Sequence, residues 1–316
     1  FNELNGYLTE QVNLNLISVK TPEMWSVSRL NDYGKCPFRF WVSHTLKIEK
    51  MEEPELGLDS RLLGEVYHKA LEVFYLELKE RALSLLGADE ALLQEIFESS
   101  IKSAIVWLET TRKFRHTDFW EYEQKEIAFR LRRFFVKEKE RAVRSGGEFV
   151  PTYFEKGFGF KDSESAPPLV VKVAGQVVKM HGRVDRIDVS SDGRVKVIDY
   201  KSSSGAISKK EALAGRNMQL PVYAMAVTDA ILADSNAQVK SGAFLSFSSG
   251  DQIGTIDFQD GENDYIGLTK EYIGNYVADI KKGNFSVKPS SPDSCKHCDH
   301  QQVCRITELG ASDDSD

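Results

Sequence analysis

The spacing of hydrophobic positions changes about halfway along the chain. In the first half they recur every three to four residues, which is typical of helices packed on one face. The pattern predicts a helix capped by Ser26 or Ser28, a long helix in "SRLLGEVYHKALEVFYLELKERAL", and more helix over about 88–113 and 118–144. The glycine pair that begins at Gly146 is expected to end the last of these helices.

The second half is rich in Val, Ile and Phe in short runs that predict strands. "PLVVKVAGQVVKMHGRVDRIDVS" and "RVKVIDYKSS" carry hairpin turns at Ala174-Gly175 and Asp192-Gly193. Helical spacing returns at about 207–232 and 263–282, with one or two strands between them in "VKSGAFLSFSS" and "QIGTIDFQ". The predicted fold class is therefore α/β (α+β), with a helical N-terminal half and a mixed central sheet flanked by helices.

Length, composition and net charge exclude some classes of protein. With 316 residues and 41% hydrophobic residues, the chain can form a sizeable core. It has no apolar run of the ~18 residues that a membrane span needs, and no signal segment, so we expect a cytoplasmic protein without a membrane partner. The net charge of −7 argues against general polyanion binding. Because the chain begins with Phe1, we expect it to be a piece of a longer polypeptide.

Four cysteines are spaced like metal ligands. Cys295, Cys298 and Cys304 lie in "CKHCDHQQVC", and Cys36 lies far upstream in "YGKCPFRFW". Metal ligation is favoured over disulfides, because a large chain without a signal segment is a poor candidate for disulfides. Four thiolates suit a [4Fe–4S] cluster. The nearby His297 and His300 leave a zinc site open as the alternative.

The segment "GRVDRIDVSSDGRVKVIDYKSS" carries acidic and basic residues at the end of a predicted hairpin. Side chains alternate along a strand, so Asp199 and Lys201 share one face, and Asp185 can converge with Asp199 on the paired strand. Two carboxylates suit Mg²⁺ or Mn²⁺, and a lysine beside the metal can position or deprotonate a water. The pattern favours metal-assisted phosphodiester hydrolysis. The alternative is an ordinary surface hairpin.

Other candidate residues are unremarkable when taken alone. His68 follows a glycine in "GEVYH" on a predicted helix, and Gln219 and Tyr223 lie one helical turn apart in "QLPVY". Glu155 in "YFEKGF" is a lone acid in an apolar strand and is interpreted as an edge or solvent-facing residue.

Together these motifs form a specific pattern. G-x-x-x-H, then "GRVDRID", "DYK" and Q-x-x-x-Y, in this order, resemble the RecB-like branch of the PD-(D/E)XK nuclease superfamily. One cysteine before the motifs and three after them resemble the iron–sulfur nuclease domain of AddB-type helicase-associated exonucleases, as does "SVSRLNDYGKCPFRFWV". The resemblance covers roughly residues 26–305 and implies a restriction-endonuclease-like nuclease core. "DYK" has Asp where other branches use Glu.

The resemblance also implies roles for single residues. His68, Asp185, Asp199 and the carbonyl of Tyr200 would hold Mg²⁺ or Mn²⁺, and Lys201 would be the catalytic lysine. Gln219 and Tyr223 would lie beside the active site and help to hold the DNA or the metal site. The cluster ligands would be Cys36, Cys295, Cys298 and Cys304, so that a [4Fe–4S] cluster joins the two ends of the domain.

The implied function is a metal-dependent DNA nuclease, an exonuclease on single-stranded or unwound DNA in recombination and repair. The alternatives are a non-catalytic DNA-binding module and a zinc-stabilised nuclease of the same fold. No Walker A motif is found, so unwinding would come from a helicase partner or from another part of a longer chain.

The expected organisation has three parts. Residues 1–25 are an N-terminal extension, residues 26–305 form the nuclease domain, and residues 306–316 form an acidic disordered tail. Within the domain, a helical insert covers about 80–146 and the catalytic core about 147–282.

Two basic segments are candidates for DNA contact. Ile127–Arg144 has seven Lys or Arg against two Glu, interleaved with Phe129, Phe134 and Phe135. We favour a core-facing row of phenylalanines with a solvated basic side, and keep a DNA-tracking helix as the alternative. Ser208–Lys210 is the second candidate.

Overall fold

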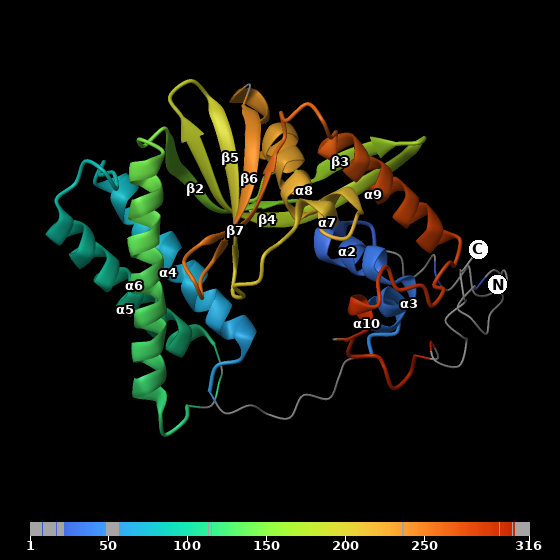
Figure 1. Ribbon diagram of the computed structural model, residues 1–316, viewed down its shortest axis with the longest axis horizontal. Helices are drawn as coiled ribbons and strands as arrows, with labels where there is room; N and C mark the ends of the chain where they lie inside the picture. The colour runs from blue at the N-terminus through green and yellow to red at the C-terminus, as the bar shows by residue number, and fades with distance from the viewer. Residues whose placement is uncertain are drawn as a thin grey trace.

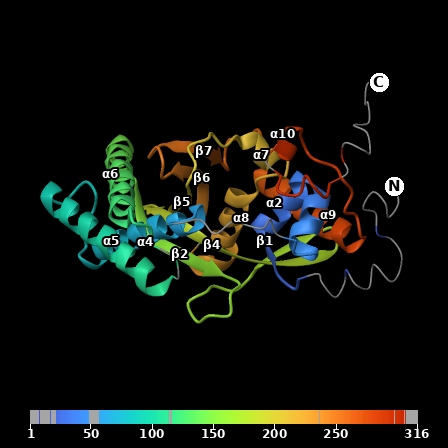
Figure 2. The same ribbon diagram turned by 90° about the horizontal axis from the view of Figure 1, so that it is seen from below.

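The computed structural model describes residues 8, 17, 22–48, 57–112, 114, 116–235, 237–296, 298–304 and 306. Within these residues a mixed sheet has helices α4, α5 and α6 on one side and α2, α8 and α9 on the other (Figure 1; Figure 2 shows the view from below). The predicted mixed α/β architecture is confirmed. The predicted N-terminal extension and acidic tail lie almost entirely outside the described residues.

The sheet is built around one long strand. In the described residues seven strands pair in the order β1-β4-β5-β6-β7, with β2 and β3 also paired to β4. β1 and β4 run parallel, as do β5 and β6, and the other pairs are antiparallel. The strands are β1 (Trp25–Ser26), β2 (Phe149–Phe158), β3 (Leu169–Val173), β4 (Gln176–Ser190), β5 (Arg194–Lys201), β6 (Gln238–Ser246) and β7 (Gln252–Asp257).

Helices make up the rest of the described framework. The α-helices are α2 (Val27–Lys35), α3 (Pro37–Phe40), α4 (Ser60–Glu80), α5 (Glu90–Thr111), α6 (Trp120–Arg144), α7 (Lys209–Leu213), α8 (Gln219–Ala226), α9 (Tyr265–Lys281) and α10 (Asp293–Lys296). Short π-helical turns, η2 (Trp41–Thr45) and η3 (Val227–Ile231), follow α3 and α8, and η4 (Ala233–Ser235) is a 3₁₀ turn. None of the described helices combines the length and apolar character needed to cross a bilayer.

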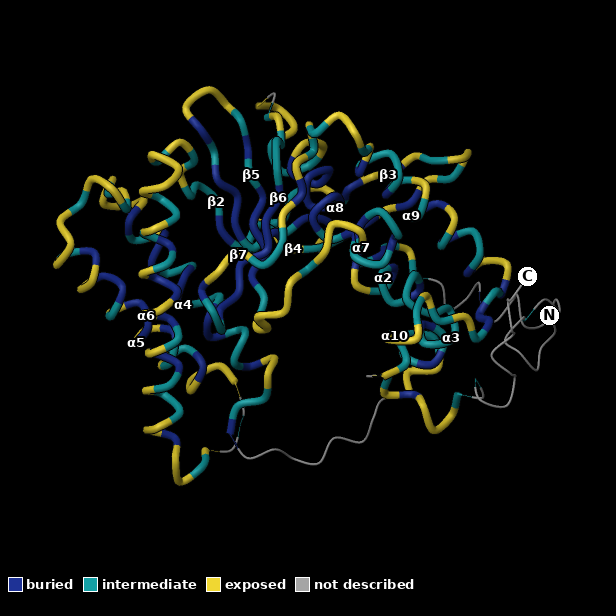
Figure 3. The backbone as a smooth tube through the Cα atoms, viewed as in Figure 1, coloured by how far each residue is buried: buried dark blue, intermediate teal, exposed yellow. Residues whose placement is uncertain are grey.

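Two hydrophobic cores lie against opposite faces of the sheet, and β5 contributes to both. Val195 and Val197 pack with α2, α8 and α9, whereas Ile198 and Tyr200 pack with α4, α5 and α6. This is the alternation expected of a strand that is buried on both faces. The buried central strands stand out in Figure 3. A residue at the end of β5 therefore lies between two helical layers.

Helix boundaries follow from local chemistry. The side chains of Ser26, Asp59 and Asp89 accept hydrogen bonds from the first turns of α2, α4 and α5. At the end of α6, Gly146 and Gly147 have φ of +61° and +70°, and the Gly147 amide donates to the Ala142 carbonyl at 3.1 Å. Glycine adopts this left-handed conformation with little strain, which confirms the predicted helix stop.

The predicted hairpins and long helices are confirmed, and two details differ. The predicted helix over 207–232 is broken at Gly215, where φ is +67° and an added Cβ would lie 2.5 Å from the Tyr276 hydroxyl. β1 was not predicted, because its two residues pair with Met180 and His181 of β4 and have no periodicity of their own. The predicted domain boundaries stay a prediction.

Candidate active site

All seven residues predicted for catalysis or metal binding lie around the C-terminal end of β5, where it reaches the middle of β4, beside α4 and α8. The antiparallel register pairs Arg186 with Ile198, which brings Asp185 alongside the last residues of β5. The Tyr200 amide donates to Asp185 Oδ2 at 2.8 Å. The residues come from four elements: His68 from α4; Asp185 from β4; Asp199, Tyr200 and Lys201 from β5; Gln219 and Tyr223 from α8.

Gln219 links the lysine to its neighbouring carboxylate. Lys201 Nζ lies 2.7 Å from Asp199 Oδ2 and donates to Gln219 Oε1 at 2.6 Å. Gln219 Nε2 donates to Asp199 Oδ1 at 2.6 Å and to the Tyr223 hydroxyl at 3.0 Å. Gln219 and Tyr223 are one turn apart on α8, so their side chains lie on the same side of that helix. The amide therefore fixes the relative orientation of Lys201 and Asp199.

A second group forms on the α4 side of the site. His68 Nδ1 lies 2.9 Å from Glu155 Oε1 and 3.9 Å from Asp185 Oδ1. His68, Glu155 and Asp185 offer one ligand atom each within 4.8 Å of one another. The histidine and two carboxylates thus form a compact donor set that could hold a divalent cation.

Glu155 is a site residue that the sequence interpretation missed. It lies in β2 between Phe154 and Lys156, whose partners in β4 are Arg186 and Val184, so it falls opposite Asp185. Its φ of +48° is unusual for a non-glycine residue inside a strand. Its partner His68 is 87 residues away in sequence, so periodicity alone could not reveal the pairing. The one feature of the sequence that could have indicated Glu155 was an acidic residue inside an otherwise apolar strand.

The site carries more buried negative charge than its cations balance. Burial raises the pKa of Asp185, and the Asp199 carboxylate raises it further, to about 8. Burial also raises the pKa of Asp199, although Lys201 opposes the shift. Burial lowers the pKa of His68, but the carboxylates of Asp185 and Glu155 outweigh that effect and raise it to about 9. An added cation would relieve this repulsion.

The donors fit a divalent cation. Asp199 Oδ2 is buried and accepts no hydrogen bond of good geometry within the described part of the chain, although Lys201 Nζ is close to it. Carboxylate oxygens suit Mg²⁺ and Mn²⁺, and an imidazole nitrogen favours Mn²⁺. Asp199 lies outside the compact set of His68, Glu155 and Asp185, so the predicted ligand set and the observed donor set overlap without being identical.

The four cysteines meet, although one is far from the others in sequence. Cys36, at the start of α3, lines one small hollow together with Cys295, Cys298 and Cys304. All four are half-buried free thiols. Burial raises the pKa of the Cys295 thiol, and the nearby Cys36 and Cys298 raise it further. The convergence expected of four ligands is present, and the cluster itself stays a prediction.

The zinc alternative fits this arrangement less well. Tetrahedral zinc with Zn–S of about 2.3 Å would bring its sulfurs to about 3.8 Å from one another. Among the described residues, no three cysteine sulfurs lie within 4.8 Å of one another. His300 Nε2 lies 2.7 Å from Ser43 Oγ, which engages that nitrogen, and His297 lies outside the described residues.

A buried ion network occupies the α4–α6 face of the same strands. Arg186 donates to both oxygens of Asp188, at 2.5 and 2.7 Å, to Glu138 Oε1 at 2.5 Å and to the Tyr75 hydroxyl at 2.8 Å. Burial raises the pKa of Glu138, but Arg186 and Arg141 outweigh it and lower the pKa to about 2. Arg186 also reaches the Tyr200 hydroxyl at 3.4 Å, so the network supports the strand end that carries the candidate site.

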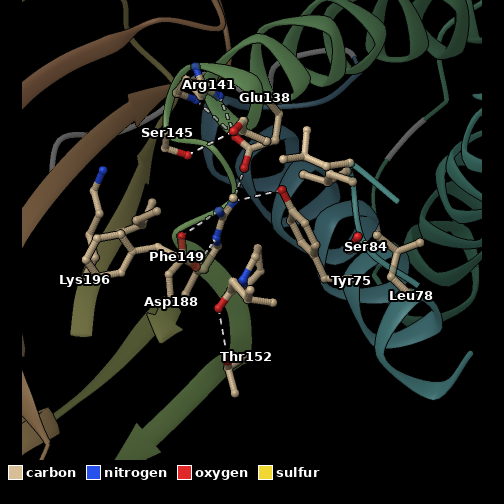
Figure 4. A pocket seen from close by; sticks show the side chains of 18 of the residues that line it. Tyr75, Leu78, Ser84, Glu138, Arg141, Ser145, Phe149, Thr152, Asp188 and Lys196 are labelled. Atoms are coloured by element: carbon tan, nitrogen blue, oxygen red, sulfur yellow. Dashed lines mark hydrogen bonds and ion pairs between the residues drawn. The ribbon is translucent and has the colours of Figure 1, made fainter. Parts of the chain in front are cut away.

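A hollow of about 720 Å³ opens beside this network (Figure 4). Tyr75 of α4, Glu138 and Arg141 of α6, and Asp188 and Lys196 of the sheet lie around it. None of the seven predicted catalytic and metal residues lines it. The candidate site therefore rests on the convergence of ionisable side chains and not on the presence of a deep pocket.

The two predicted DNA-contact segments have different environments. Phe134 and Phe135 are buried in the helical core, as the favoured interpretation of Ile127–Arg144 requires, whereas Phe129 is exposed. In the second segment, Ser208 caps α7 by accepting a hydrogen bond from the Lys210 amide, and the Lys209 and Lys210 side chains are exposed.

Comparison with known proteins gives the family. The sequence matches the family model of the PD-(D/E)XK nuclease superfamily over residues 24–305. A subunit of the ATP-dependent helicase/deoxyribonuclease of Clostridium botulinum (strain Hall) is 29% identical over 253 residues, which cover 75% of this chain and 20% of that protein. The corresponding protein of Moorella thermoacetica is 33% identical over 217 residues, which cover 66% of this chain and 18% of that protein.

This chain thus spans about a fifth of the length of these relatives. A solved structure from Eubacterium rectale aligns over 96% of this chain and 98% of its own, with 16% identity and a TM-score of 0.43. The family model covers most of the chain, including every residue of the candidate site. The chain belongs to the PD-(D/E)XK nuclease superfamily.

Proposed function

We propose that this domain hydrolyses phosphodiester bonds in DNA with the help of Mg²⁺ or Mn²⁺. The observation that carries the proposal is the meeting of Lys201, Asp199, Asp185, Glu155 and His68 where the C-terminal end of β5 reaches the middle of β4. Removing so many ionisable groups from water is costly unless a further cation balances them. Such an arrangement is typical of a reaction centre.

The metal would be held by His68, Asp185 and Asp199, with Glu155 as a further ligand or as the hydrogen-bond partner that orients His68. The carbonyl of Tyr200 is the remaining proposed ligand. A bound divalent cation supplies polarisation of the phosphodiester and a more acidic water. Because the pKa of His68 is raised to about 9, metal binding would displace a proton from its ring at neutral pH.

Lys201 has the central role among the protein groups. Gln219 Oε1 accepts from its ammonium group and keeps it beside Asp199. From this position Lys201 can orient an attacking water and offset the negative charge that develops on the phosphate oxygens. Tyr223 supports this geometry through Gln219, so we assign it a positioning role.

We infer that the substrate is single-stranded or unwound DNA and that the domain acts as an exonuclease. The relatives are named as subunits of ATP-dependent helicase/deoxyribonucleases, which supports DNA as the substrate and a helicase as the partner. The absence of a Walker A motif in this sequence is consistent with unwinding by another chain or another part of the same chain.

We further propose that Cys36, Cys295, Cys298 and Cys304 hold a structural [4Fe–4S] cluster. The hollow that the four cysteines share supports a bound group there, and the fact that no three of the described sulfurs lie within 4.8 Å of one another favours a cluster over a single zinc ion. Hydrolysis of a phosphodiester needs no electron transfer, so the expected role is to join the N-terminal and C-terminal segments. Absorption in the visible region, together with iron and zinc analysis of the purified protein, separates the two metals.

The test of the enzymatic function is digestion of DNA labelled at its 5′ or 3′ end, single-stranded or duplex, with Mg²⁺ or Mn²⁺. We expect progressive shortening of the single strand from one end, and the labelled products report the polarity. Binding without cleavage under all of these conditions would instead support the non-catalytic DNA-binding module.

The role of Glu155 has its own test. Glu155→Gln should weaken Mn²⁺ binding by about 10–100-fold, the range found for groups that orient metal ligands. Its lost activity should return as the metal concentration is raised. The matched control is Glu164→Gln in the exposed loop after β2, which should behave as wild type. Unchanged metal dependence in Glu155→Gln would remove Glu155 from the metal site.

A further inference from the structure

Helix α6 exposes a row of apolar side chains on its outward face. Tyr122, Phe129, Val136 and Val143 are 68%, 53%, 50% and 67% exposed, respectively. They are spaced seven residues apart, and positions seven apart lie on nearly the same side of an α-helix. Exposed positions recur along α6 in Figure 3. We call this row, with the cations beside it, the α6 outer face.

The residues beside the row argue against a partner helix. A coiled-coil seam needs a second apolar row three or four residues away from the first. At those positions α6 carries Lys125, Arg132 and Lys139 on one side of the row and Glu126, Arg133 and Glu140 on the other. A mainly cationic border beside aromatic rings suits a nucleic-acid strand, whose phosphates need cations and whose bases stack on rings.

Two of these cations are available for such a ligand. Arg132 is held by both carboxylate oxygens of Glu98, and Lys139 pairs with Glu90. Within the described part of the chain, Lys125 has no carboxylate within 4 Å, and Arg133 contacts only the Ser249 carbonyl, at 3.4 Å. Lys125 and Arg133 lie on opposite borders of the row, on either side of Phe129.

The buried side of α6 packs against β5, the strand that carries the candidate lysine. The ring of Phe134, one residue after Arg133, packs edge-on against Tyr200 with 5.7 Å between ring centroids. Arg133 contacts the loop between β6 and β7, and the Phe247 amide at the start of that loop donates to the Lys201 carbonyl at 2.8 Å. The middle of α6 is therefore joined to the strand end that carries the candidate lysine.

The length of the face fits a short stretch of strand. From Tyr122 to Val143 the helix rises about 30 Å at ~1.5 Å per residue. That length corresponds to about nine nucleotides if they keep the ~3.4 Å spacing of a stacked strand. Single-stranded sites in proteins commonly span about 4–16 nucleotides.

We propose that the α6 outer face binds single-stranded DNA outside the active site, with Tyr122 and Phe129 stacking on bases and Lys125 and Arg133 contacting phosphates. The proposal rests on the proposed nuclease function and assigns it a binding surface for the part of the substrate that is not being cleaved. It predicts that affinity grows with strand length until the face is filled.

The test measures binding separately from cleavage. Fluorescence anisotropy of the full chain in EDTA, with labelled single-stranded DNA of about 6 and about 20 nucleotides, gives the two affinities. Tyr122→Ala/Phe129→Ala should weaken binding of the longer strand by at least about fivefold, the smallest loss expected for one base–aromatic stack. Binding of the shorter strand, and its cleavage with Mg²⁺, should change little.

The phosphate contacts have a separate readout. Lys125→Gln/Arg133→Gln should reduce the slope of log affinity against log salt concentration by about 1.4, because each single-strand phosphate contact contributes ~0.7. The matched controls are Val106→Ala and Lys102→Gln, exposed apolar and basic positions on α5, which should leave both affinity and slope unchanged.

The outcomes separate this inference from the proposed function. If the wild-type protein cleaves DNA but both double variants bind the longer strand as tightly as wild type, the inference is overturned and the nuclease proposal stands. If the wild type binds with the predicted length dependence but never cleaves, the inference stands for a DNA-binding module. Equal losses in the α5 controls would show a general surface effect and would also overturn the inference.

Discussion

Two groups of ionisable side chains are built around neighbouring residues of β4, Arg186 and Asp185, and their charges are balanced differently. In the network around Arg186, two arginines face two carboxylates, and the pKa of Glu138 falls to about 2. In the candidate site one residue away, Asp185, Asp199 and Glu155 outnumber Lys201 and His68, and the pKa of Asp185 rises to about 8. The first group has as many arginines as carboxylates, whereas the second has one carboxylate more than its basic groups.

The difference shows what each group does for the molecule. A buried charge whose partners and hydrogen bonds are complete contributes to the structure, and removing one member leaves another uncompensated. A buried site with excess carboxylates is destabilising until a cation binds, which is the condition for a functional metal site. The comparison predicts that substitution in the network around Arg186 lowers stability, whereas substitution in the candidate site lowers activity and leaves the protein folded.

The largest expected effect is on activity. Lys201→Ala should lower the cleavage rate by about 10²–10⁴-fold, the usual contribution of a positioned acid–base or charge-stabilising group. Since Lys201 is partly exposed at the end of the central strand β5, its loss should leave the protein folded and able to bind DNA. Single-turnover cleavage, circular dichroism and anisotropy measure the three properties. Wild-type cleavage by this variant would contradict the assignment of the site.

The next effect is on stability. Arg186→Met should lower the free energy of unfolding by about 3–5 kcal/mol, because Asp188 stays buried without its partner and Glu138 keeps only Arg141. Urea unfolding measures the change. Arg194→Met is the matched control: Arg194 pairs with Asp192 and Glu148 on the surface, so the loss should stay below about 1 kcal/mol. Equal midpoints for the two variants would contradict the distinction between buried and surface networks.

The cysteine group extends the comparison to a site whose ligands come from both ends of the chain. Cys36→Ala should lose iron and visible absorption and should unfold at lower temperature. A cluster closing a loop of about 260 residues would stabilise the fold by roughly 4–5 kcal/mol on the scale derived for disulfides, and strain would reduce that value. Ser294→Ala, in the same hollow, should keep its iron. Retained iron and thermal stability in Cys36→Ala would exclude Cys36 as a ligand.

The smallest effect is the dependence of stability on pH, and it has opposite signs in the two groups. The raised pKa values of Asp185 and His68 contribute stability at low pH, which is lost as pH rises through about 8 and 9. The lowered pKa of Glu138 contributes stability above 4.5, which is lost as pH falls toward about 2.

In EDTA, the melting temperature should therefore fall as the pH rises from about 4 to about 9, and Mg²⁺ should raise it most at the alkaline end. Asp185→Asn should flatten the alkaline decline. A melting temperature that is independent of pH in EDTA would contradict the charge imbalance at the site.

The sequence alone determined the local structure and indicated most of the candidate site residues. Helical spacing and glycine stops predicted α4, α5 and α6, and the Asp192-Gly193 turn predicted the β4–β5 hairpin. Side-chain alternation along that hairpin was enough to bring Asp185, Asp199 and Lys201 together. These features depend on neighbours within a few residues, so local propensity and periodicity are sufficient to predict them.

Only the tertiary structure decided which distant residues meet. Glu155 pairs with His68 because β2 lies along β4 with the acid opposite Asp185, a register that no local pattern specifies. Phe134 and Phe129 lie on the same basic helix, yet one is buried and the other exposed, because the sheet covers one side of α6. Contacts across many residues depend on packing of whole layers, and packing follows from the complete fold and not from any one segment.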